Sequence, residues 1–246
     1  MTVGTVAITR ATFFSTHHAS AADALAGREC DFRAPTYSLL VGRARRFTSL
    51  VTQLHIEVCG ALHDPGAARD DLPITVFATR HGEIQTAERL ITDFREAAMV
   101  SSARFALSVH NTPSGVYAVA VGSNAPSTTI TGSNAVAGGW LEAVLTVLER
   151  ERPVLLSIAD EPVPAALHDP APPIGAAAAF LLAPVAAGGP RATLATLAIE
   201  PDDGDGEIDA RRTLAAVAEG VAAAPIALGR IRPGARLALR LAGEAA

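Results

Sequence analysis

The sequence predicts an α/β fold with a mixed, mostly parallel sheet and helices on both faces. Short β-prone runs alternate with longer segments of helical periodicity along most of the chain. Of the 246 residues, 49% are apolar, which is ample for a sizeable core. No long linker divides the sequence, so we expect residues 1–246 to form a single domain.

The first hundred residues predict two strands and three helices. Alternating apolar residues predict a strand at 3–9, and a strongly β-prone run predicts a buried strand at 74–78. A short helix is expected at 20–25. Apolar residues at helical spacing predict longer helices at 48–62 and 83–97, the first ended by Asp64-Pro65-Gly66.

The middle of the chain predicts a helix, a strand, a second helix and a second strand. A helix within 108–121 must carry Pro113 in its first turn. Residues 127–131 are β-branched and predict a strand, and 135–150 predicts a helix that packs closely through Gly138 and Gly139. A buried strand is expected at 153–158.

The last ninety residues predict three strands and one helix. Strands are expected at 176–183 and 193–200, paired with each other through a turn at 187–190. A polar loop at 202–207, a helix at 210–223 and a last strand at 236–241 follow.

Composition excludes several classes of function. The formal charge is −5, and no basic stripe indicates a nucleic-acid partner. The amino terminus does not resemble a signal peptide, and the apolar run 175–184 is too short to cross a bilayer. We therefore expect a cytoplasmic protein without a membrane span.

Neither metal nor cofactor motifs occur. The seven histidines form no ligand pattern, no glycine-rich nucleotide loop follows a strand, and a Walker lysine is impossible because the chain has no lysine. Cys59 lies in a predicted helix as a core residue, and Cys30 lies between two acidic residues that disfavour a thiolate. We expect no metal and no cofactor.

Two local features have open interpretations. Ser133 lies between a strand end and a helix start, where a hydroxyl can cap the helix or act as a nucleophile with His110 as base. Arg43, Arg45 and Arg46 form a basic cluster that either docks an acidic partner or is simply solvated.

Several strings, in order, resemble the β-ketoacyl synthase N-terminal domain family of thiolase-like fold. They are Arg45–Leu50, Thr79–Glu83, Leu141–Ala143, Gly175–Phe180 and, above all, Phe105-Ala-Leu-Ser-Val-His-Asn-Thr-Pro-Ser-Gly115. The resemblance covers roughly residues 1–200 and is to the short, chain-length-factor-like synthase subunit of aryl polyene and polyketide clusters. It implies a thiolase-like half and leaves 207–246 as a family-divergent extension that covers a sheet face.

The resemblance argues against independent catalysis. Active synthases place a nucleophilic cysteine at the start of a buried helix, and that position falls on Asn134, beside Ser133. The chain also lacks the His-Gly-Thr-Gly string of those enzymes. It therefore implies no catalytic residues and a degenerate nucleophile position at Asn134.

The implied role is a silent partner of a full-length ketosynthase in polyketide, aryl polyene or fatty-acid-like elongation. An acyl carrier protein would dock at Arg43, Arg45 and Arg46. The strand at 127–131 would be a sheet edge at a dimer axis, and the helix near 108–121 would line the acyl tunnel. The candidates for the tunnel and interface are Val109, His110, Asn111, Val116, Val119, Ser127, Thr128, Thr129, Ile130 and Thr131. A homodimeric scaffold or acyl-binding protein, and an acyltransferase that uses Ser133, remain alternatives.

Overall fold

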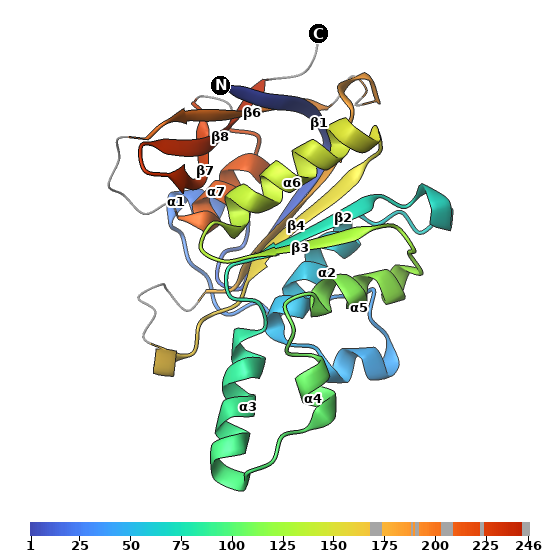
Figure 1. Cartoon of the computed structure of the whole chain (residues 1–246), viewed down its shortest axis with the longest axis vertical. Coiled ribbons are helices and arrows are strands. Elements are labelled where there is room, and N and C mark those ends of the chain that lie inside the picture. The colour runs from blue at the N-terminus through green and yellow to red at the C-terminus, as the bar shows by residue number, and fades with distance from the viewer. Residues whose placement is uncertain (168–173, 188, 190–191, 203–208, 222–223, 243–246) are drawn as a thin grey trace.

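The computed structural model describes residues 1–167, 174–187, 189, 192–202, 209–221 and 224–242. One sheet runs through the molecule, α6 lies across it, and α3 and α4 project from one end (Figure 1). The strands are β1 Thr2–Ser15, β2 Ile74–Thr79, β3 Ser127–Thr131, β4 Val154–Asp160, β5 Ala176–Ala183, β6 Thr193–Pro201, β7 Ile226–Arg232 and β8 Ala235–Ala242.

Seven α-helices and four short 3₁₀ helices connect these strands in the described residues. The α-helices are α1 Ala21–Ala26, α2 Leu50–Leu62, α3 Ile84–Ala97, α4 Ser102–Ala106, α5 Thr112–Val121, α6 Ala135–Arg150 and α7 Ala210–Ala218. The 3₁₀ helices are η1 Gly42–Phe47, η2 Arg69–Asp71, η3 Ala165–Leu167 and η4 Val185–Ala187. None of the helices in the described part of the chain is long and apolar enough to cross a membrane.

The sheet has eight strands in the order β3-β2-β4-β5-β1-β6-β8-β7. Only β3–β2 and β2–β4 are parallel, and every other neighbouring pair is antiparallel. The α/β, mixed-sheet prediction is confirmed, but the expectation of a mostly parallel sheet is wrong. Parallel strands need long crossover connections, and the chain has them between β1 and β2 and between β6 and β7 as well. Those strands are not neighbours, however, because β4 and β5 lie between the first pair and β8 lies between the second, each joined to its neighbours in the antiparallel sense except at β2–β4.

The two faces of the sheet build separate cores. In β4 alternate residues point to opposite faces: Leu156 and Ile158 pack in the cluster that includes α6, whereas Leu155 and Ala159 pack against α2 and α5. Trp140 of α6 belongs to the first cluster and is fully buried. The expected helices on both faces are thus present.

Helix α6 lies close to the parallel strands because glycines face them. A Cβ on Gly139 would lie 2.8 Å from the Cβ of Ala78, and one on Gly138 would lie 2.9 Å from Cγ2 of Ile130. Real side chains avoid such distances, so the glycines set the depth of packing. The predicted bounds of α6 and β3 match the structure residue for residue.

The carboxyl-terminal segment departs further from expectation. Strand β1 lies between β5 and β6, so the predicted pairing of 176–183 with 193–200 is wrong. Helix α7 ends at Ala218, before the expected residue 223, and β7 was not predicted. Residues 188 and 190 of the turn predicted at 187–190, and residues 203–207 of the loop predicted at 202–207, lie outside the described residues.

Candidate functional site

The carboxyl ends of the parallel strands β2 and β3 are the part of the fold where a ligand site is expected. Strand β2 is followed by α3, α4 and α5, and Tyr117 of α5 packs on the α2 face of the sheet. Strand β3 leads directly into α6 on the opposite face. Connections that leave adjacent parallel strands toward opposite faces open a crevice where α/β proteins commonly bind ligands.

The end of β3 and the turn into α6 lie at this position. Gly132 has a φ of 109°, which favours glycine, and its N–H donates to the carbonyl of Arg80 over 3.2 Å. Asn134 is the N-cap of α6 and makes no capping hydrogen bond with its side chain. Ser133 precedes the cap and is exposed, so it is not the helix cap that its position suggested.

Ser133 and His110 do not form a catalytic pair in this structure. His110 packs beside Gly82, where an added Cβ would lie 3.3 Å from the Cβ of His110. Both Ser133 and His110 are exposed, and no hydrogen bond within the described residues joins them. A base must reach its nucleophile within hydrogen-bond distance, at most through one water.

Neither cysteine is placed to act at the carboxyl ends of β2 and β3. Cys59 is fully buried on α2, and burial raises the pKa of its thiol to about 12. Cys30 lies in the segment after α1, where its N–H donates to the carbonyl of His17. The position before α6 that the resemblance singled out holds Asn134, whose amide cannot accept an acyl group.

A buried carboxylate holds the ends of β2 and β4 together. Oδ1 of Asp160 accepts hydrogen bonds from the hydroxyl of Thr79 over 2.9 Å and from the N–H of Arg80 over 2.6 Å. Burial raises the pKa of the Asp160 carboxyl, and these hydrogen bonds act in the opposite direction. Asp160 therefore orders the turn that leads from β2 into α3.

A second carboxylate ties two helix starts to the sheet. Glu161 is 4% exposed, and its two oxygens accept from the N–H of Val51 over 3.1 Å and of Gln85 over 3.0 Å. These N–H groups belong to the first turns of α2 and α3, which leave donors unsatisfied and favour negative charge. Burial raises the pKa of Glu161 to about 7.

Glu83 completes this group of buried acids. Its oxygens accept from the hydroxyls of Thr52 over 2.7 Å and Thr86 over 3.1 Å. Burial raises its pKa, and its charge in turn raises the pKa of Glu161. The sequence analysis did not single out Glu83, Asp160 or Glu161; the available signal was an acidic residue just after each apolar strand.

The tunnel and interface candidates lie on α5, on the turn before it and on β3. Val109 and Val119 are 46% and 85% exposed, whereas Val116 is half-buried against the α2 core. Asn111 is the N-cap of α5, again without a side-chain cap. β3 is at the edge of the sheet, and its exposed ends, Ser127 and Thr131, flank the half-buried Thr128, Thr129 and Ile130.

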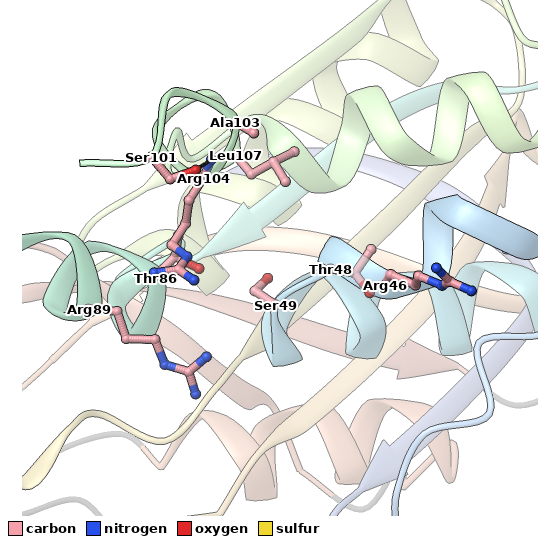
Figure 2. A pocket seen from close by; sticks show the side chains of 9 residues that line it. All are labelled: Arg46, Thr48, Ser49, Thr86, Arg89, Ser101, Ala103, Arg104 and Leu107. Atoms are coloured by element: carbon pink, nitrogen blue, oxygen red, sulfur yellow. Dashed lines mark hydrogen bonds between the residues drawn. The ribbon is translucent and has the colours of Figure 1, made fainter. Parts of the chain in front are cut away.

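The basic cluster is divided between two environments. The guanidinium of Arg45 stacks on the ring of Tyr37 at 4.4 Å and donates to the carbonyl of Thr36. Arg46 lines a cavity near the start of α2 (Figure 2). The backbone of Arg43 lies in η1, and its side chain is outside the described residues.

His55 and Ser157 form a further buried polar pair, which lies in the core. Nδ1 of His55 lies 2.8 Å from the hydroxyl of Ser157, and burial lowers the pKa of His55 to about 3. The imidazole is therefore neutral at physiological pH. Within the described ranges, no group of three or more His, Cys, Asp or Glu side chains is arranged to hold a metal ion.

Known structures share this fold at low sequence identity. A ketosynthase (ApeO) in complex with its chain length factor (ApeC) from Xenorhabdus doucetiae contains a chain that aligns with a TM-score of 0.73 and 18% identity, over 96% of this chain and 99% of that one. The ishigamide ketosynthase/chain length factor aligns with a TM-score of 0.55 and 15% identity, over 80% of this chain and 64% of that one.

A β-ketoacyl synthase from Burkholderia phymatum STM815 aligns with a TM-score of 0.51 and 13% identity, over 89% of this chain and 70% of that one. These likenesses confirm the thiolase-like fold class. No protein of curated function matches the sequence. The model of the β-ketoacyl synthase N-terminal domain matches residues 25–224, so this chain belongs to the β-ketoacyl synthase N-terminal domain family.

Proposed function

We propose that this protein is a non-catalytic, chain-length-factor-like subunit that pairs with an active ketosynthase during acyl chain elongation. The main support, beyond membership of the family, is that the unpaired edge of β3 lies beside a nucleophile position that holds Asn134. Elongation would take place in the cytoplasm, on polyketide, aryl polyene or fatty-acid-like chains.

The edge of β3 has the properties of a surface that is covered in an assembly. The strand Ser127–Thr131 carries no charge, proline or bulge, although such features protect free edges from pairing. Val119 exposes 85% of its surface on the neighbouring helix α5, which contacts β3. An exposed apolar residue beside an unprotected edge supports pairing with another sheet.

The chemistry at the carboxyl ends of β2 and β3 supports a silent role. Acyl transfer from a thioester needs a nucleophile, and condensation needs donors that stabilise an enolate. The amino end of α6 presents Ser133 and Asn134, and Cys59 is held as a buried thiol in α2. The active partner would supply the cysteine and histidines.

We expect helix α5 to influence chain length in such a pair. Val116 is half-buried between α5 and the α2 core, and α5 packs against β2 and β3. The same proposal includes docking of an acyl carrier protein at Arg43, Arg45 and Arg46. Their positive charges would attract a carrier with an acidic surface. Residues 1–246 would act as one domain, with 207–246 as its family-divergent part.

The decisive experiment is co-expression with the full-length ketosynthase encoded nearby, followed by a condensation assay of the pair and of each chain alone. Co-purification, with elongation by the pair only, supports the proposal. Val116→Phe should then shorten the product, and Ser133→Ala should leave the yield unchanged.

Two outcomes contradict the proposal. If the chain purifies as a homodimer that does not bind the synthase, the homodimeric scaffold is favoured instead. If the chain alone becomes acylated by an acyl thioester and Ser133→Ala abolishes the label, it is an acyltransferase.

A further inference from the structure

A cavity of about 210 Å³ lies between the start of α2, helix α3 and helix α4, away from the edge of β3. Its lining includes Arg46 before α2, Arg89 from α3 and Arg104 from α4. Figure 2 shows Arg104 extending toward Thr86, with Arg89 on the neighbouring turn of α3 and Ser49 facing them from the start of α2. Three helical segments thus contribute arginines to the lining, and the Arg46 side chain extends away from the other two.

The charge of this cavity is only partly compensated. Arg104 forms an ion pair with Asp93 at 2.5 Å, outside the lining. Arg46 and Arg89 have no ion pair or hydrogen-bond partner among the described residues, and no acidic side chain is part of the lining. The guanidinium N–H groups of Arg46 and Arg89 donate to no carboxylate oxygen among the described residues, and such planar pairs of donors match phosphate oxygens.

The hydroxyls of the lining have different uses. Thr86 donates to Glu83, and Thr48 donates to the carbonyl of Arg45, so neither is available to a ligand. The oxygen of Ser101 accepts from the N–H of Arg104, and its own hydrogen has no acceptor among the described residues. Ser101 therefore remains as a neutral donor beside the arginines.

Buried acids lie beneath the cavity, and their charge opposes an anion. Glu83 is bonded to Thr86, and Glu161 lies near enough to Arg89 for the guanidinium to lower its pKa. Burial nevertheless raises the pKa of both carboxyls, that of Glu161 to about 7, so part of this negative charge is neutralised near neutral pH. Arg46 and Arg89, which form no ion pair in the described residues, then supply the net positive charge of the cavity, because Arg104 is paired with Asp93.

We propose that this cavity binds the phosphate group of an organic phosphate monoester. The phosphate would contact Arg89, Arg104 and the hydroxyl of Ser101, with Arg46 at the rim. The cavity exceeds the ~30 Å³ share of one water several-fold, and Ala103 and Leu107 give it an apolar side for the organic part. The site is independent of the proposed pairing through β3.

Calorimetry with phenyl phosphate tests the site on the purified full chain at low salt. We expect saturable binding that Arg89→Gln weakens about tenfold or more, since a charge-assisted bidentate contact is lost. Arg95→Gln, an exposed arginine on the same helix but outside the cavity, is the matched control and should change affinity less than about twofold.

Benzoate and inorganic phosphate define the ligand class. If benzoate binds as tightly as phenyl phosphate, the site does not select phosphate. If inorganic phosphate binds as tightly as phenyl phosphate, the site does not recognise the organic part of a monoester. No binding to the unmodified chain, or equal losses in Arg89→Gln and Arg95→Gln, would overturn the site itself. Thermal shifts by phenyl phosphate in folded Ser101→Ala and Arg89→Gln variants give a second readout, and both shifts should be reduced.

Discussion

The two halves of the sheet end in different ways. The parallel half ends at β3, whose five residues carry no charge and pair regularly with β2. The antiparallel half ends at β7, where two register shifts bend the strand and Arg230 and Arg232 point charge into solvent. Bulges and charges keep a free edge from pairing, so β7 is built to remain an edge and β3 is not.

The halves also differ in their buried acids. Asp160 is the last residue of β4, Glu161 follows it and Glu83 follows β2, so the carboxyls with burial-raised pKa values gather at the ends of parallel strands. In the antiparallel half, Glu200 pairs with Arg240 at 2.5 Å and Asp202 with Arg230. At the parallel ends, Glu161 accepts from helix N-terminal N–H groups, Asp160 from the turn after β2 and Glu83 from threonine hydroxyls. The acids of the other half pair with arginines instead.

Charging the β3 edge should have the largest effect. The double substitution Ser127→Arg with Thr131→Arg places on β3 the charges that β7 already carries, and it should weaken association with the ketosynthase about tenfold or more. Sedimentation velocity of the mixed chains measures the loss. Arg232→Thr on β7 is the control and should leave association unchanged; an intact complex with the doubly charged β3 would show that this edge is not the interface.

The buried acid Glu161 should make stability depend on pH. Its folded pKa of about 7 lies above the ordinary value of 4.5, so the folded chain holds more protons between these values. The free energy of unfolding therefore falls as pH rises from 4.5 to 7, by up to about 3 kcal/mol. Urea unfolding at several pH values measures this slope.

Glu161→Gln should flatten most of that slope, with the remainder due to Glu83 and Asp160, whose pKa values are shifted in the same direction. Glu149→Gln is the control, because that side chain is 70% exposed. An unchanged slope in Glu161→Gln would mean that Glu161 is not the titrating group.

Substituting a glycine where α6 packs closely on the parallel strands should have a smaller effect, on the free energy of unfolding. Gly139→Ala brings a methyl group to within 2.8 Å of Ala78 and should cost about 1–3 kcal/mol in the free energy of unfolding. Gly115→Ala meets no atom within 4 Å in helix α5 and should instead stabilise by about 0.5–1 kcal/mol. Equal effects in urea unfolding would contradict the packing argument.

A substitution beside the edge should have the smallest effect on association. Val119→Asp places a charge on a residue that is 85% exposed in the free chain, so folding should not change. If a partner covers it, association should weaken about threefold to tenfold by sedimentation. Leu145→Asp on α6 is the matched control, 45% exposed; equal effects of the two would remove α5 from the interface.

The local elements could be predicted because their signals are local. β-branched residues 127–131 and the helical run 135–150 mark β3 and α6, and Pro113 is tolerated in the first turn of α5. The edge position of β3 was also predicted, though from family resemblance rather than from the residues. The absence of a cysteine before α6 could be recognised from the sequence alone.

Strand order and contacts between distant residues could be learned only from the tertiary structure. The placement of β1 between β5 and β6 rests on hydrogen bonds between residues far apart in the chain, which no local pattern specifies. The same holds for Glu161, which joins the first turns of two helices, and for the gathering of Arg46, Arg89 and Arg104 around one cavity. The sequence by itself determined most of the strands and helices, though not β7, and which nucleophile is missing. Strand order and the grouping of charges follow from packing between segments, where burial and long-range pairing outweigh local preference.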